Sequence, residues 1–243
     1  MHTITEQATI ALTCYDEANH EKYVKRAFPL AVYHKRKTDT EFFGWIDHGN
    51  GLASVWMEGT HGENFAKKIV AWAGNLAASD NDNNGQHDGF QMIADMIFRL
   101  IGGYLLEYRT LYFFGHSRAC AVLALLAYVI KKQKESIAIS GRVFCPPPPG
   151  NRKFAKEFDA LIPDWVSYVM EGDYINTGKM RNDGDAMLDG VDLGEIRKLP
   201  PVGIVHKIPL IRAYAHAPKR VCKSLYKMYK EPGLKDVERW CLK

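Results

Sequence analysis

The stretch Leu111-Tyr112-Phe113-Phe114-Gly115-His116-Ser117-Arg118-Ala119-Cys120-Ala121 decides the fold that this sequence predicts. The residues before Gly115 are mostly apolar or aromatic and do not alternate with polar ones, which indicates a short buried strand. An almost wholly apolar run, residues 119–130, follows, and its length and its content of Ala and Leu predict a buried helix. Ser117 is therefore predicted to lie where a strand turns sharply into a helix.

The residues around Ser117 favour a particular kind of turn. Gly115 and Ala119 are small and flank the serine at a distance of two residues on each side. This spacing is typical of a nucleophile elbow, which lifts a serine hydroxyl above the carboxyl edge of a sheet. The alternative is an ordinary turn in which Ser117 caps the helix, because Ser is a favoured N-cap residue. These residues alone leave both interpretations open.

Composition places the chain among ordinary globular proteins. It has 243 residues, of which 47% are hydrophobic and 25% charged, and this length suits one large domain or two small ones. A net charge of +4 is too small to predict a nucleic-acid partner. The five cysteines are scattered without a C-x-x-C pair, which argues against a disulfide framework or a zinc site. No signal-peptide pattern or apolar run of membrane-spanning length is found, so we expect a reduced, cytoplasmic protein.

Strand and helix patterns alternate along the rest of the chain. Two β-rich runs, residues 41–47 and 52–57, are separated by a glycine-containing hairpin turn. Further patterns predict helices over 65–76, 89–101 and 151–158 and strands over 137–144 and 165–170. This alternation predicts an α/β fold with a mainly parallel central sheet and helices on both faces. We expect one domain over 1–243, with a helical lead-in over 1–40 and a surface excursion over 176–200.

Two acidic segments are candidate cation sites. Residues 80–88 resemble the front of a calcium loop, but Gln91 stands where the bidentate Glu of such a loop is required. A second group of carboxylates lies between Asp183 and Glu195. In both segments a solvated loop is the favoured interpretation, and no metal is predicted.

The C-terminal segment, residues 217–243, is predicted to be a basic helix. Lys219, Lys223, Lys227 and Lys230 recur on one helical face, whereas Val221 and neighbouring apolar residues favour another. Such a helix can make peripheral contact with an anionic membrane surface. A helix packed on the sheet, with its lysines in water, is the favoured alternative.

Several motifs, taken together and in order, resemble those of one known family. They are Val55-Trp56-Met57-Glu58-Gly59-Thr60, Trp72-Ala73-Gly74-Asn75-Leu76, His87-Asp88-Gly89-Phe90, Gly115-His116-Ser117-Arg118-Ala119, Phe144 to Asn151, Gly172-Asp173-Tyr174-Ile175 and Leu199 to His206. The sequence thereby resembles the class 3 lipases, the fungal-lipase-like branch of the α/β-hydrolases, over roughly residues 42–229. The resemblance implies an α/β-hydrolase fold.

The resemblance also implies a catalytic site. Ser117 would be the nucleophile, and Asp173 would orient the general base, His206, with His216 as the alternative base. The backbone N–H groups of Thr60 and Arg118 would form the oxyanion hole. The implied reaction is hydrolysis of a lipid or other acyl ester through an acyl-serine intermediate, without a cofactor, beneath a short lid over residues 61–76.

Three residues depart from the family pattern. Glu58 replaces the usual Arg, and Ala119-Cys120 replaces the usual Gly-Gly. Because Ala and Cys are small, we expect the elbow to be kept. The departures leave open a catalytically silent module of the same fold that binds a membrane surface or a protein partner. Acyl transfer or thioester cleavage by the same triad is a third reading.

Overall fold

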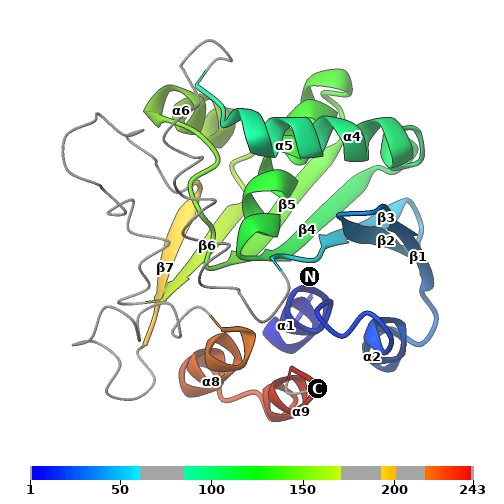
Figure 1. The fold of residues 1–243 in the computed structure, drawn as a ribbon, viewed down its shortest axis with the longest axis vertical. Coiled ribbons are helices and arrows are strands. Elements are labelled where there is room, and N and C mark those ends of the chain that lie inside the picture. The colour runs from blue at the N-terminus through cyan, green and yellow to red at the C-terminus, as the bar shows by residue number, and fades with distance from the viewer. Residues whose placement is uncertain (1, 61–84, 171–192, 201–216, 242–243) are drawn as a thin grey trace.

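The computed structural model describes residues 2–60, 85–170, 193–200 and 217–241, and the structural statements below concern these residues. They contain one seven-stranded sheet in the order β1-β2-β3-β4-β5-β6-β7. The strands are β1 (Val32–Lys37), β2 (Phe42–Gly49), β3 (Leu52–Met57), β4 (Thr110–His116), β5 (Ala138–Phe144), β6 (Trp165–Met170) and β7 (Glu195–Leu199). The sheet forms the middle layer of the molecule (Figure 1).

The direction of the strands divides the sheet into two parts. β1, β2 and β3 pair antiparallel, whereas β3 to β7 pair in parallel. In the parallel part, Trp56 of β3 lies opposite Phe114 of β4, and His116 lies opposite Phe144 of β5. The carboxyl ends of β3, β4 and β5 therefore meet at one edge, where side chains from distant parts of the sequence come together.

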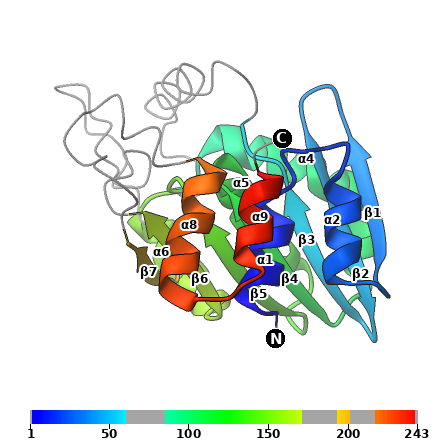
Figure 2. The ribbon, with the colours of Figure 1, turned by 90° about the horizontal axis from the view of Figure 1, so that it is seen from below.

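Helices cover both faces of the sheet, as predicted. One face carries α4 (Asp88–Leu105), α5 (Arg118–Gln133) and α6 (Arg152–Leu161). The opposite face carries α1 (Ile4–Leu12), α2 (His20–Ala27), α8 (Pro218–Tyr229) and α9 (Leu234–Trp240), which Figure 2 shows from below. Each face has its own apolar core, and α5 supplies much of the first because its residues from Ala119 to Tyr128 are all buried.

The first and last helices belong to the same layer. The Thr5 hydroxyl of α1 donates a hydrogen bond to Glu231, between α8 and α9, at 2.6 Å. Tyr23 of α2 stacks on Trp240 of α9 with ring centroids 4.7 Å apart. These contacts join the first two helices to the last one, and Figure 1 shows α1, α2 and α9 side by side in one layer.

Most predicted elements are confirmed, with three corrections. The lead-in predicted as helical over 1–40 also contains β1, a mostly exposed edge strand rich in Lys and Arg. The predicted surface excursion over 176–200 ends in β7, which pairs with β6. The predicted C-terminal helix over 217–243 is two helices, because Lys230 adopts a left-handed conformation and Pro232 and Gly233 follow it.

Several predictions lie outside the described residues. These are the lid over 61–76, the helix over 65–76 and most of the two acidic segments. In the part of the chain that the structure describes, no group of three or more His, Cys, Asp or Glu is arranged to hold a metal ion. None of the described helices is long and apolar enough to cross a membrane.

Candidate active site

Ser117 occupies the turn between β4 and α5, as its sequence predicts. Its backbone has φ 60° and ψ −137°, a conformation that non-glycine residues rarely adopt. Its N–H donates a hydrogen bond to the carbonyl of Phe144 at 3.0 Å, which ties the turn to the end of β5. Ser117 occupies the N-cap position of α5, but its side chain makes no capping hydrogen bond to the helix, which favours the elbow over an ordinary capping serine.

The neighbours of Ser117 fit closely into this turn. A side chain at Gly115 would come within 2.9 Å of Leu123 and 3.3 Å of the Cys120 backbone nitrogen, so a larger residue would fit there only if these neighbours shifted. Ala119 and Cys120 are buried without disturbing the turn, and the Cys120 thiol donates to the Phe144 carbonyl at 3.3 Å. Burial raises the pKa of Cys120 well above its usual value, so its thiol stays neutral. The two replacements therefore preserve the elbow.

The end of β3 passes directly beside the elbow. The Glu58 N–H donates to the Phe42 carbonyl at 2.9 Å, which continues the β2–β3 pairing to this edge. A side chain at Gly59 would overlap the Tyr15 hydroxyl and approach the His116 carbonyl oxygen to 2.8 Å. The segment that leads into Thr60 therefore lies against the residue that precedes Ser117.

A buried ion pair holds the side chain that follows Ser117. The Arg118 guanidinium donates two hydrogen bonds to the Glu41 carboxylate, at 2.8 and 2.6 Å. The two side chains are only 14% and 5% exposed. Glu41 comes just before β2, so the pair connects the first turn of α5 to the antiparallel part of the sheet.

Tyr15 is a further residue of this site. It follows α1, and its hydroxyl lies 2.7 Å from Nδ1 of His116, which is fully buried. Burial, assisted by the neighbouring Cys14, Cys120 and Glu58, raises the pKa of Tyr15 well above its usual value. The sequence pattern of residues 1–30 holds no signal for this contact.

Two of the motif segments are joined at the start of α4. The backbone N–H of His87 donates to the Pro149 carbonyl at 2.9 Å, and that of Asn151 donates to the Gly85 carbonyl at 2.7 Å. The Asn151 side chain also accepts from the N–H groups of Lys153 and Phe154, so Asn151 caps α6. These bonds fix the entrances of α4 and α6 beside the carboxyl edge of the sheet.

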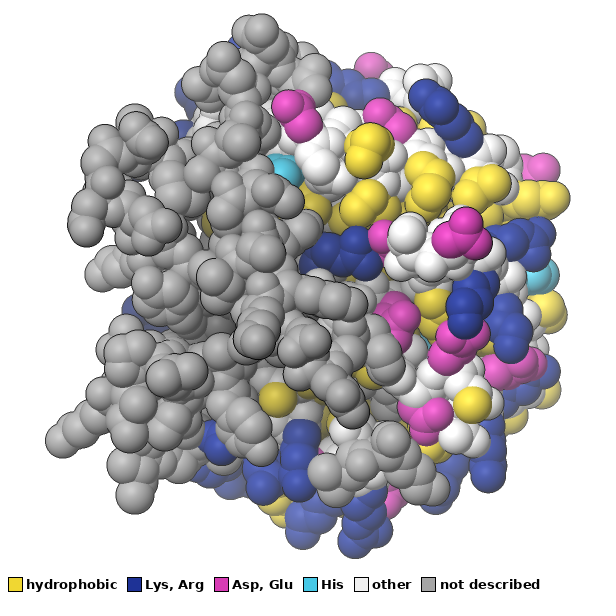
Figure 3. Space-filling model, viewed as in Figure 1, with side chains coloured by type: hydrophobic (Ala, Val, Ile, Leu, Met, Phe, Trp, Pro, Cys, Tyr) yellow, Lys and Arg dark blue, Asp and Glu magenta, His cyan; other side chains and the backbone are white. Residues whose placement is uncertain are grey.

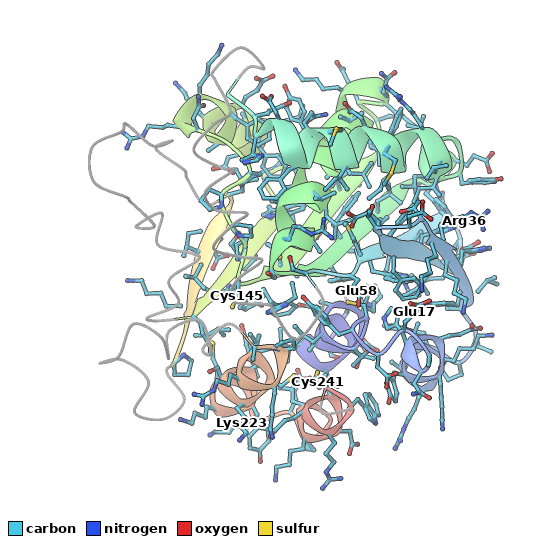
Figure 4. All side chains as sticks on the ribbon, in the orientation of Figure 1. Glu17, Arg36, Glu58, Cys145, Lys223 and Cys241 are labelled. Atoms are coloured by element: carbon cyan, nitrogen blue, oxygen red, sulfur yellow. The ribbon has the colours of Figure 1, made fainter. Side chains whose placement is uncertain are left out.

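The structure describes three of the predicted site residues. Ser117 and Arg118 form the turn from β4 into α5, and Thr60 follows Gly59, which packs against His116. Asp173, His206 and His216 lie outside the described residues. Glu58 and Cys145 lie on the side of the sheet that carries α1 and α8 (Figure 4).

A mainly parallel sheet with helices on both faces and a strained serine between a strand and a helix define an α/β-hydrolase fold. The family model for lipase (class 3) matches residues 58–180, about half of the chain. The chain belongs to the class 3 lipase family. A search of the curated proteins found no match.

Solved structures share this fold at low sequence identity. M37 lipase is 13% identical with a TM-score of 0.64, and the match covers 98% of each chain. The triacylglyceride lipase of Rhizomucor miehei is 15% identical with a TM-score of 0.60, covering 80% of this chain and 78% of that one. The lipase of Rhizopus microsporus var. chinensis is 18% identical with a TM-score of 0.58, covering 71% of this chain. The match spans 66%, just under two thirds, of that Rhizopus chain.

Proposed function

We propose that this protein is a serine hydrolase of carboxylic esters and that Ser117 is its nucleophile. The observation that carries the proposal is the strained backbone of Ser117 at the strand-to-helix turn, with a hydroxyl that the helix does not use. Strain of this kind persists only where the surroundings impose it, and it clusters at functional sites. Membership of the class 3 lipase family supports the same conclusion.

In the proposed mechanism, the Ser117 hydroxyl attacks the ester carbonyl while His206 takes its proton. Asp173 holds the second ring nitrogen of that histidine and stabilises the imidazolium that forms. The negative oxygen of the tetrahedral intermediate accepts hydrogen bonds from the N–H groups of Thr60 and Arg118. The same histidine then gives its proton to the leaving alcohol, and water releases the acid from the acyl-serine. His216 is the alternative base.

The proposed substrates are lipid or other acyl esters. The Rhizomucor miehei neighbour is a triacylglyceride lipase, and its likeness supports an ester of a fatty acid as the first substrate to test. The 61–76 segment is proposed as the lid over the site. None of these steps requires a metal or an organic cofactor.

Labelling and turnover test this proposal together. A fluorophosphonate should label the protein at a single serine, and a p-nitrophenyl ester should be hydrolysed. Ser117→Ala should abolish both, whereas Ser140→Ala, which changes a buried serine within β5, should leave labelling intact. Labelling and turnover that persist in folded Ser117→Ala protein would end the proposal. Parallel variants Asp173→Asn, His206→Gln and His216→Gln identify the partners of Ser117.

Contact with an anionic membrane surface is a second part of the proposal, and one observation favours it. The helices α2, α8 and α9 and the turn after α8 carry ten Lys and Arg side chains against four Asp and Glu, although the whole chain has a net charge of only +4. Figure 3 shows Lys and Arg side chains gathered along the lower edge of the molecule. Each basic residue near an anionic surface contributes about 1 kcal/mol of attraction.

Liposome sedimentation tests the membrane contact. The protein should sediment with phosphatidylserine vesicles at low salt and much less with neutral vesicles or at high salt. Lys227→Glu and Lys230→Glu should weaken the binding, whereas Lys35→Glu, on the edge strand β1, should not. Equal binding to both kinds of vesicle would contradict an electrostatic contact. Vesicle binding by a folded protein that no fluorophosphonate labels would favour the catalytically silent module instead.

The cysteines support a proposed location in a reducing, cytoplasmic compartment. None of the five, all of which the structure describes, takes part in a disulfide, and four of them are buried. Retention in the cytosolic fraction of cells that produce the full chain would test this location.

A further inference from the structure

We propose that Tyr15 and Glu41 are positioning residues that hold the backbone N–H groups of Thr60 and Arg118 in place as the oxyanion hole. Both come from the first part of the chain, which carries none of the proposed catalytic groups. The inference rests on the proposed function, because an oxyanion hole has meaning only if Ser117 attacks an acyl group.

Glu41 connects the two segments that carry the proposed donors. Its backbone is fixed by a turn in which the Glu41 carbonyl accepts from the Thr38 N–H at 2.9 Å and the Thr38 hydroxyl accepts from the Glu41 N–H at 3.0 Å. The next residue, Phe42, accepts from the Glu58 N–H at 2.9 Å, two residues before Thr60. The Glu41 carboxylate meanwhile holds Arg118 at two points. Glu41 therefore lies between the segments that carry the two proposed donors.

The ion pair suits positioning better than it suits stability. A buried pair recovers little more than the cost of removing both charges from water, so it is weak evidence for a stabilising role. A bidentate Arg–carboxylate pair does fix geometry, because two parallel hydrogen bonds define an orientation. Arg118 is the first residue of α5, where backbone N–H groups have no partner within the helix. An ion pair that fixes the Arg118 side chain therefore also fixes the Arg118 backbone N–H, which is available to a ligand.

Tyr15 acts on the same two segments from the other face of the sheet. Its hydroxyl hydrogen-bonds to His116, the residue before Ser117, at 2.7 Å. The same oxygen lies so close to Gly59, the residue before Thr60, that no side chain fits there. Tyr15 thus fixes the end of β3 relative to the elbow. Glu41 fixes the end of β3 relative to α5.

Steady-state kinetics with a p-nitrophenyl ester test the proposal. Removing one oxyanion donor costs about 10²–10³-fold in rate, so displacing one should cost part of that. We expect Glu41→Gln, Arg118→Met and Tyr15→Phe each to lower kcat by about 10-fold or more. KM should stay within about 3-fold, because the donors act mainly on the transition state. Arg118→Met keeps the backbone N–H donor, so a lower kcat in this variant would come from a displaced donor and not from a missing one.

Two further measurements separate positioning from a general structural role. The double variant Glu41→Gln/Arg118→Met should be no slower than the slower single variant, because both changes break one link. Arg142→Gln is the matched control, since Arg142 has the same 14% exposure and pairs with Asp164 at 2.7 Å. It should lower the melting temperature to a similar degree with kcat unchanged. A trifluoromethyl ketone, which binds as an oxyanion, should lose affinity in the three test variants and not in the control.

The outcomes distinguish failure of the inference from failure of the proposed function. If the wild-type protein is labelled and active but the test variants match Arg142→Gln in kcat, the positioning role is overturned and the function stands. If the wild-type protein is neither labelled nor active, both are overturned. Tyr15→Phe removes a single oxygen, so it decides the question if Glu41→Gln does not fold.

Discussion

Close packing at Gly59 gives a stability prediction for a single residue. Gly59→Ala should destabilise the protein by about 1–3 kcal/mol, because the added methyl group overlaps the Tyr15 hydroxyl and approaches the His116 carbonyl. Gly103→Ala is the opposite case, since nothing lies within 4 Å of its added methyl group and the residue is exposed in α4. It should stabilise by up to about 1 kcal/mol.

Urea denaturation of the two alanine variants provides the measurement. Adding Tyr15→Phe to Gly59→Ala should recover part of the loss, because the overlapping oxygen is then gone. Equal urea midpoints for Gly59→Ala and Gly103→Ala would contradict the prediction, because they would mean that the segment leading into Thr60 can shift without a loss of stability.

The contacts of single residues explain how much of the site could be predicted. Ser117 is predictable because small residues and two apolar runs mark its turn within a short stretch. Tyr15 and Glu41 are not, because their partners His116 and Arg118 lie about 100 and 77 residues away in the sequence. No local pattern records a contact that exists only after the sheet has assembled.

At the scale of the element, the end of α8 yields a second prediction. Lys230 closes the helix in a left-handed conformation, with φ 59° and ψ 17°, where glycine is preferred. Lys230→Gly should therefore raise the free energy of unfolding by about 0.5–1 kcal/mol. Lys227→Gly, one turn earlier within α8, should lower it by about 1 kcal/mol.

Thermal melting of Lys230→Gly and Lys227→Gly compares the same substitution in two backbone conformations. A lower melting temperature for Lys230→Gly than for the wild type would mean that its contact with the Tyr226 ring, at 5.9 Å, outweighs the backbone strain.

The elements that the sequence failed to predict share a physical cause. β1 and β7 are the two edge strands, and each carries several charged side chains. Charged edges protect a sheet from pairing with other chains, and they also remove the apolar pattern by which strands are recognised. The strands between them, β2 to β6, are largely buried and were all predicted.

At the scale of the whole molecule, buried histidines predict loss of stability in acid. Burial lowers the pKa of His20 to about 3 and that of His2 to about 4, from about 6.5 in the unfolded chain. At a pH between the folded and unfolded pKa values, these histidines bind protons in the unfolded chain but not in the folded protein. Stability should therefore be highest above pH 6.5 and fall by up to about 1.4 kcal/mol per pH unit for each histidine as the pH drops.

Unfolding followed between pH 7 and pH 4 measures this slope. His20 is held by the Tyr33 hydroxyl at 2.8 Å and the Ile10 carbonyl at 3.1 Å, and both contacts suit a neutral ring. His20→Gln should lose stability at pH 7 but show a shallower pH dependence. An unchanged slope in this variant would show that His20 does not titrate during unfolding.

The contact between the first and last helices has a consequence for chain connectivity. Because Thr5 at the start of α1 reaches Glu231 just before α9, whereas Trp240 at the end of α9 reaches Tyr23 of α2, the two ends of the described chain lie at opposite ends of α9, and a peptide linker that joins them must span the length of that helix (Figure 2). New ends can then be cut at the β2–β3 turn, next to Asn50, which precedes the first residue of β3 and so lies at the edge of the sheet opposite the carboxyl ends of β3 and β4. Such a circular permutant would begin with the strand that leads to Thr60, and Tyr15 and Glu41 would be made last. The permutant would make the same contacts of Tyr15 and Glu41 in a different order of synthesis, so its activity would show whether the site depends on the order or only on the finished fold.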